Sequence, residues 1–230
     1  MTATDQKSSG ELGAYLAASD GLSGVEGTPA WLADLRRNGI THFTELGFPT
    51  LKQEEWVFTN VKPILELSFI PATAPGSAKI EVDGFTFDGL AGPRLVFVDG
   101  HLSHAHSELP ELPDGVVVTN LASAVEAHGE LVEKHLGRYA KTDESGFSAL
   151  NTAFIQDGVF IYLPQGEVLR EPVHLLFIST DGDTNTANLR NLIVAEANSQ
   201  GKVIESYYSA GDQAVFTNVV TEVVLAMSAT

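Results

Sequence analysis

Three histidines lie close together in the middle of the sequence, at His101, His104 and His106, and Glu108 and Glu111 follow them. Imidazole and carboxylate groups are common ligands of metal ions. Side chains alternate between the two faces of a strand, so the rings of an H-x-H pair on a strand would share one face. The spacing therefore raises the hypothesis of a metal site built from His104, His106 and Glu111.

This arrangement resembles part of the metal-binding pattern of cupins, which would make the protein a metal-dependent oxygenase or isomerase. The second cupin motif is Gly-x5-Pro-x-Gly followed by a histidine. Gly158, Pro164 and Gly166 satisfy its first part. Leu169, however, stands where the histidine is required, and His174 could replace it only from the wrong register. A metal triad would therefore lack one ligand.

The simpler interpretation is a polar turn after Asp99-Gly100, with surface histidines ahead of a proline-rich loop. Turns and loops collect such residues, and the glycine that cupins carry ahead of His104 is missing. We therefore expect His101, His104 and His106 to hold no metal. The cupin-like enzyme that uses His104, His106 and Glu111 remains the alternative.

The sequence shows no other catalytic arrangement. It contains no phosphate-binding G-x-x-x-x-G-K-[ST] or G-x-G-x-x-G loop and no G-x-S-x-G nucleophile elbow. The absence of cysteine removes disulfides, thiolate nucleophiles and thiolate metal ligands. Glu54 and Glu55 are neighbours on an expected helix and point to different faces, whereas an acid–base pair must converge on one cleft. The sequence therefore predicts no catalytic residue and a protein that is not an enzyme.

Composition limits the class of partner. The 230 residues carry a formal net charge of −17 and have a hydrophobic fraction of 43%, which fits a folded chain. Nucleic acid and anionic membranes would repel such a chain, and we see no basic patch that would override the repulsion. The first ten residues are polar and the apolar runs are short, so we expect no signal peptide, no membrane span and a cytoplasmic protein.

The first part of the chain is expected to be helical. Thr28-Pro29 predicts the start of a helix and Asn38-Gly39 predicts its end. Thr50 to Gln53 is a capping-box pattern that would open a second helix through Trp56, which Pro63 would limit. Residues 71–76, rich in proline and alanine, read as a linker.

Strands are expected afterwards. Residues 79–82, 94–98 and 116–119 read as strands, the first two closed by Asp-Gly turns, and a helix capped by Asn120 should run to Gly137. From Val159 onward, β-branched apolar runs alternate with short polar turns, and no helix intervenes. This pattern favours a sandwich, a barrel or a β-solenoid, and periodicity alone does not choose among them. These runs are residues 159–163, 173–178, 189–194, 203–207 and 215–225.

Two longer strings resemble one protein family. Residues 47–59, GFPTLKQEEWVFT, are similar to the SufD signature G-L-P-[TS]-x-K-x-E-E-W-x-x-T. Residues 150–166, LNTAFIQDGVFIYLPQG, are similar to the block that opens the SufD core, and Pro172-Val173-His174 continues in the same style. The likeness covers roughly residues 30 to 225, and long ordered strings are more specific than isolated letters.

The resemblance implies an α+β fold with a helical N-terminal region followed by a right-handed parallel β-helix. We accordingly expect a helical region over residues 1–76, a mixed segment over 77–146 and a β-helix core over 147–230. It also implies a non-catalytic scaffold in iron–sulfur cluster assembly, acting with a SufB-type scaffold and a SufC-type ATPase. The chain alone would bind no cofactor, and the complex would assemble the cluster. The family places its ATPase-docking and scaffold-interface residues beyond this chain.

A solenoid reading also bears on the last strand. Each coil pairs its backbone only with its neighbours, so an end coil needs a cap. Residues 217–225 are strongly β-forming, and only five residues follow them. We expect this edge to favour self-association. A β-helix that acts on polysaccharide is a further hypothesis, but such a protein would ordinarily be secreted, and no signal peptide is seen.

Overall fold

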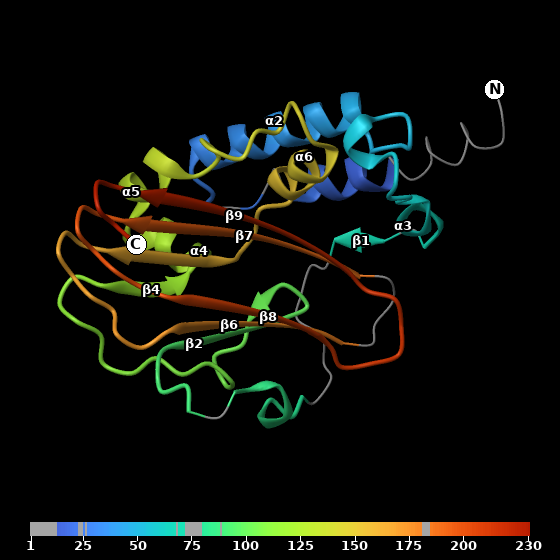
Figure 1. The fold of residues 1–230 in the computed structure, drawn as a ribbon. Coiled ribbons are helices and arrows are strands. Elements are labelled where there is room, and N and C mark those ends of the chain that lie inside the picture. The colour runs from blue at the N-terminus through green and yellow to red at the C-terminus, as the bar shows by residue number, and fades with distance from the viewer. Residues whose placement is uncertain are drawn as a thin grey trace, which may run out of the picture.

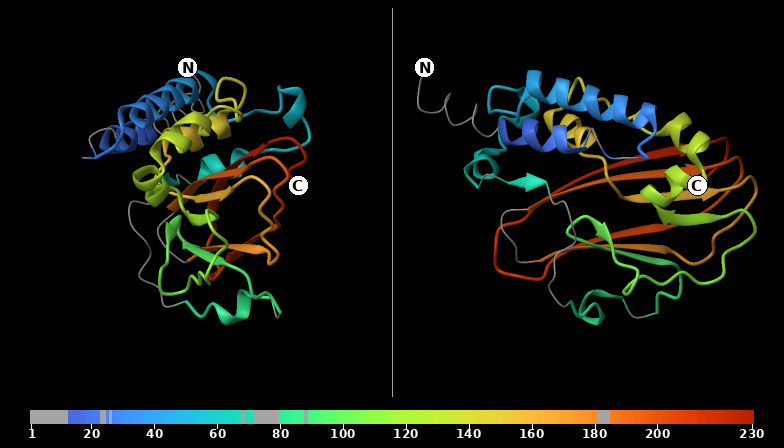
Figure 2. Two further views of the ribbon diagram at one scale, coloured as in Figure 1. Left: turned by 90° about the vertical axis from the view of Figure 1, so that its left-hand side faces the viewer. Right: turned by 180° about the vertical axis from the view of Figure 1, so that it is seen from behind.

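Two β-sheets and a layer of helices make up the fold. The computed structural model describes residues 13–22, 25, 27–67, 69–71, 80–87, 89–180 and 185–230. One sheet contains five strands and the other four. The sheets face each other, and the helices lie over the outer face of the five-stranded sheet (Figures 1 and 2). The expected α+β class is therefore confirmed.

The helices belong mainly to the first two thirds of the chain, and residues 13–22 are also helical. Asn120 does not cap α4 with its own side chain. Its amide instead donates to Asp157, whose Oδ1 accepts the Ala122 backbone N–H at 3.1 Å. The α-helices are α2 (Ala30–Leu46), α3 (Lys62–Glu66), α4 (Leu121–Ala127), α5 (Gly129–His135) and α6 (Gly146–Ala153), and the 3₁₀ helices are η1 (Glu54–Trp56) and η2 (Asp83–Phe85).

The strands divide between the two sheets. The five-stranded sheet has the order β1-β7-β5-β4, with β9 also paired to β7, and the four-stranded sheet has the order β3-β2-β6-β8. The strands are β1 (Ile70–Pro71), β2 (Arg94–Val98), β3 (His101–Leu102), β4 (Val117–Asn120), β5 (Val159–Leu163), β6 (Val173–Ser179), β7 (Asn185–Ala195), β8 (Val203–Ser209) and β9 (Phe216–Leu225).

From β5 to β9 the chain alternates between the sheets. β5, β7 and β9 are neighbours in one sheet, β6 and β8 in the other, and all these pairs are parallel. Val173 pairs with Val203 and Ala195 pairs with Leu225, an offset of 30 residues in both sheets. The turns stack as well, since Gly166 N–H donates to the Ala197 carbonyl and Asn198 N–H to the Met227 carbonyl.

The space between the sheets holds the largest apolar cluster. Val159 and Ile161 of β5 point into it together with Leu175 and Phe177 of β6, whereas Phe160 points to the helices. This alternation is the period of two that a strand imposes on its side chains. Across the four-stranded sheet, the rings of Phe97, Phe177 and Tyr207 stack in register at 5.4 and 5.0 Å.

An aromatic cluster joins the helical layer to the strands. Phe43 of α2 contacts Phe48 at 5.2 Å between ring centroids, and Phe48 contacts Phe147 of α6 at 5.5 Å. Phe147 in turn contacts Phe216 of β9, while Trp56 packs on Phe147 at 5.2 Å. The segment 47–59 therefore fastens the first helices to α6 and to the last strand.

The five expected strands from Val159 onward are all present, but several helix expectations were wrong. α2 does not end at Gly39; it continues to Leu46 and ends at Gly47, which has φ 62°. Gly39 serves instead as a close-contact residue, because a Cβ there would lie 2.5 Å from the Ala153 backbone nitrogen. The glycine lets α2 cross α6 at short range.

Three other local expectations also failed. The capping pattern forms, with Thr50 N–H donating to Gln53 Oε1, but only the 3₁₀ helix η1 follows it. Asp83-Gly84 lies in η2 and not in a hairpin turn. The helix after Asn120 is two helices, α4 and α5, and α6 was not predicted at all. Most of the expected linker, and residue 79 of the first expected strand, lie outside the described residues.

The crossing of α2 and α6 predicts an inverted response to alanine. Alanine normally stabilises a helix interior relative to glycine by roughly 1 kcal/mol. Gly39→Ala should instead destabilise the protein by about 1–3 kcal/mol, because its methyl group meets backbone atoms. Gly129→Ala is the matched control, since nothing lies within 4 Å of its Cβ position. Chemical denaturation measures both variants, and a neutral or stabilising Gly39→Ala would contradict this packing.

Candidate interaction edge of the two sheets

The sequence-predicted histidines lie at one end of the four-stranded sheet. His101 opens β3, whereas His104 and His106 lie in the turn that follows it. His104 is exposed, as is Glu111, and His106 shares a hydrogen bond of 2.8 Å with Ser103 Oγ. A local Ser–His contact is the ordinary behaviour of a polar turn.

The two positions that decided against a cupin are buried elsewhere. Leu169 is part of the apolar cluster between the sheets. His174 lies on β6, where it bonds Ser206 Oγ of β8 at 3.0 Å, and burial lowers the pKa of this histidine. Among the residues that the structure describes, no group of three or more His, Cys, Asp or Glu side chains could hold a metal ion. The absence of metal at His101, His104 and His106 remains a prediction.

Within the described ranges, no helix is long and apolar enough to cross a membrane.

A buried ion pair fixes the last two strands of the five-stranded sheet. Arg190 of β7 and Glu222 of β9 are fully buried, and Arg190 Nη2 lies 2.9 Å from Glu222 Oε2. Arg190 Nη1 also donates to Asn151 and Thr152 of α6. Asn151 Nδ2 donates in turn to the carbonyl oxygens of Leu189 and Asn218. The pair therefore connects two strands with the helical layer.

Glu222 also holds a loop. Its carboxylate accepts backbone N–H groups from Gly137 at 2.7 Å, Tyr139 at 2.8 Å and Ala140 at 3.0 Å. Burial alone would raise the pKa of Glu222, but Arg190 and the three N–H donors together hold that pKa below its usual value. The side chain is therefore ionised at neutral pH, and the segment after α5 is pinned to β9.

A second polar chain crosses the space between the sheets. Asn191 Nδ2 of β7 donates to Thr221 Oγ1 of β9, and Thr221 Oγ1 donates to Glu205 Oε1 of β8 at 3.3 Å. The other Glu205 oxygen accepts Tyr207 O–H at 2.6 Å. Partial burial and this carboxylate raise the pKa of Tyr207 well above its ordinary value. β8 and β9 are thus tied together across the interior.

The edge formed by β8 and β9 is apolar and open. In the described part of the chain, β9 pairs only with β7 and β8 only with β6. Val223 is 50% exposed, Leu225 57% and Met227 78%, in contrast to the fully buried side chains of β5. A cavity of about 250 Å³ opens beside them, lined by residues that include Leu163, Ile193 and Val203. We call β8, β9 and this cavity the coil edge.

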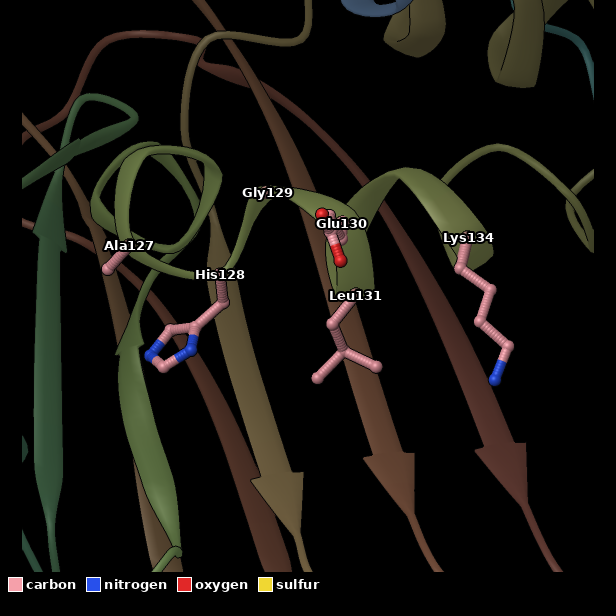
Figure 3. A pocket seen from close by; sticks show the side chains of 6 residues that line it. All are labelled: Ala127, His128, Gly129, Glu130, Leu131 and Lys134. Carbon is pink, nitrogen blue, oxygen red and sulfur yellow. The ribbon is translucent and has the colours of Figure 1, made fainter.

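A further hollow lies at the junction of α4 and α5. The side chains of His128, Leu131 and Lys134 extend from it in one direction (Figure 3). The His128 ring stacks near Phe160 at 6.0 Å, and Glu130 adds a negative charge to the same hollow. Its mixed charges do not converge on one point, and a helix as short as α5 is no anion site. The coil edge is the stronger candidate.

Sequence reasoning missed the polar residues that hold this edge. Arg190 and Glu222 are each the only charged residue in a strand that is otherwise apolar or neutral, which is a visible signal of a buried pair. The 30-residue offset was also missed, because few identical residues mark it. Asn188 and Asn218 are such a pair, and they bond each other at 3.1 Å.

Removing the charge of Glu222 should destabilise the protein strongly. Glu222→Gln leaves Arg190 buried without a counter-charge, which typically costs about 3–5 kcal/mol. The folded-state pKa of Glu222 is depressed, so its contribution is complete above the unfolded pKa and is lost as pH falls through the folded value. The stability difference between wild type and variant should therefore be constant from pH 7 to about 5 and narrow below about 4.

Urea denaturation across that pH range measures the difference. Glu133→Gln, on the exposed face of α5, is the control and should change stability by less than about 0.5 kcal/mol. Equal stability of wild type and Glu222→Gln at pH 7 would contradict the proposed role of the ion pair.

Comparison with known proteins places the chain among cluster-assembly proteins. A family model described as the SufBD protein N-terminal region matches residues 25–175. The chain is 30% identical over 211 residues to the iron–sulfur cluster assembly protein SufD of Bacillus subtilis, a match that covers 85% of this chain and 46% of that protein.

Two other relatives agree. An iron–sulfur cluster assembly SufBD family protein of Synechocystis is 28% identical over 218 residues, covering 90% of this chain and 47% of that protein. A SufBD family protein of Arabidopsis thaliana is 26% identical over 218 residues, covering 84% of this chain and 44% of that protein. The chain thus spans about half the length of the relatives it matches.

Proposed function

Because the chain belongs to the SufBD family, we propose that it is a SufD-type scaffold subunit that takes part in the assembly of iron–sulfur clusters. The observation that carries the proposal is the family match over residues 25–175, together with relatives whose names give this role. These comparisons do not favour the cupin-like enzyme built on His104, His106 and Glu111. The cluster is the cargo of the assembly and not a resident cofactor of this chain.

We further propose that residues 147–230 form the first coils of a right-handed parallel β-helix. The support is the chain path, which alternates between two sheets while each strand pairs in parallel with the strand two places later. The constant offset of 30 residues and the stacked turns fit a solenoid, in which each coil contacts only its neighbours.

A scaffold role fits the coil edge better than a catalytic role does. Two exposed strand edges flank a cavity of about 250 Å³ whose lining is almost entirely apolar. Strand edges of this kind recruit further strands through backbone hydrogen bonds. The occupant we propose is a further parallel coil, for which relatives of twice this length have room.

We propose a SufB-type scaffold and a SufC-type ATPase as partners. The test is affinity purification of the native protein from its own cells under mild conditions, followed by mass spectrometry. Both partner types should co-purify in stoichiometric amounts, and depletion of the protein should lower the activity of iron–sulfur enzymes. A protein that purifies without either partner, and whose loss leaves those enzymes active, would refute the proposal.

The coil edge also predicts the solution behaviour of the 230-residue chain. Its unpaired strands and exposed Val223 should make the isolated chain self-associate despite its charge of −17. Val223→Lys should shift light-scattering mass toward the monomer, because a charge on an edge strand opposes pairing. Val57→Lys, at a site of similar exposure far from the coil edge in sequence, is the control and should not. A monodisperse monomer with no variant effect would contradict this prediction.

A further inference from the structure

A small closed cavity lies where the two sheets meet. It is about 10 Å³ in volume and is lined by the Asp99-Gly100-His101 turn at the end of β2, by Gln156, and by Thr186 to Asn188 at the start of β7. Roughly 10–15 Å³ is the smallest space that holds one water molecule. Most of the residues that line it are polar, which an empty cavity in a protein core is not.

Two unsatisfied polar atoms belong to residues that line this cavity. In the described part of the chain, four buried side-chain atoms have no hydrogen-bond partner, and Thr186 Oγ1 and Asn188 Nδ2 are two of them. Thr186 is 1% exposed and Asn188 8%. Buried polar groups are nearly always hydrogen-bonded to protein or to ordered water. The cavity and the missing partners are independent observations that coincide at one place.

The hydrogen bonds around Asn188 fix which of its amide atoms lacks a partner. The carbonyl oxygen of Phe147 can only accept, so the Asn218 atom 3.0 Å from it is the Nδ2 donor. The same Nδ2 lies 3.1 Å from Asn188, so the Asn188 atom facing it is the Oδ1 acceptor. The remaining atom of Asn188 is therefore an N–H donor that needs an acceptor.

The other side of the cavity offers acceptors. The carboxylate of Asp99 accepts the Thr180 N–H at 2.8 Å and the Thr180 O–H at 2.7 Å, which leaves further lone pairs on both oxygens. A cation would be repelled by the amide hydrogens of Asn188, and an anion would be repelled by Asp99. A single small neutral molecule that both donates and accepts fits both walls.

We propose that this cavity is a binding site for one ordered water molecule, which accepts from Asn188 Nδ2, bonds Thr186 Oγ1 and donates toward Asp99. The water joins the turn after β2 to the start of β7, a corner where the chain passes between the two sheets. Buried waters of this kind typically make about three hydrogen bonds and are costly to remove.

Thr186→Val separates a filled cavity from an empty one by the sign of its effect. Valine keeps the shape of threonine and removes only the hydroxyl. If a water is bound, the variant should lose one long-lived water in oxygen-17 magnetic relaxation dispersion, and its Tm should fall by about 2–4 °C. If the cavity is dry, the variant removes an unsatisfied hydroxyl, so the dispersion should not change and Tm should rise.

Thr217→Val is the matched control, because that hydroxyl bonds Ser179 Oγ at 3.2 Å and does not line the cavity. It should leave the count of long-lived waters unchanged. If Thr186→Val does not fold, a high-resolution crystal structure of the wild-type protein decides. A density peak within hydrogen-bond distance of Thr186 Oγ1 and Asn188 Nδ2 supports the proposal. An empty cavity, or an anomalous peak there after soaking with thallium, would overturn it.

Discussion

The buried ion pair between Arg190 and Glu222 is the constraint that organises the rest of this structure. It lies at the outer face of the five-stranded sheet, where α6 and the segment after α5 both meet β7 and β9. Burying two charges is expensive unless each is fully hydrogen-bonded. Here the guanidinium bonds Glu222, Asn151 and Thr152, and the carboxylate accepts three backbone N–H groups as well. The arrangement is satisfied only when strands, helix and loop take their native places together.

That dependence gives the two faces of the sheet different tasks. The inner face is an apolar interior in which successive coils repeat every 30 residues, with Asn191, Thr221 and Glu205 as its polar link. The outer face carries the specific polar contacts that set register. A register slip by one residue would turn Arg190 into the apolar interior, so the ion pair disfavours it. The coil edge inherits a fixed register from these contacts and can present ordered backbone groups to a further strand.

Much of the strand pattern was predictable, because β-branched runs such as residues 159–163 stand between turns rich in glycine, asparagine and aspartate. Their pairing was not predictable from periodicity, since consecutive strands lie in different sheets and pair with strands 30 residues away. Gly39 was misread because a glycine needed for close helix crossing looks the same in sequence as a glycine that ends a helix. The histidines attracted attention as ligand types, whereas the residues that hold the coil edge, Arg190 and Glu222, are conspicuous only once a strand is known to be buried on both faces.

The central claim is that β8 and β9 form the edge on which a further coil stacks. Hydrogen–deuterium exchange, compared between the isolated 230-residue chain and the native assembly purified from its source, tests this claim most directly. The account predicts that the β8 and β9 amides that are not bonded to β6 and β7 exchange rapidly in the isolated chain and become strongly protected in the assembly, while β5 remains protected in both. Equal exchange of those amides in both samples would contradict the account.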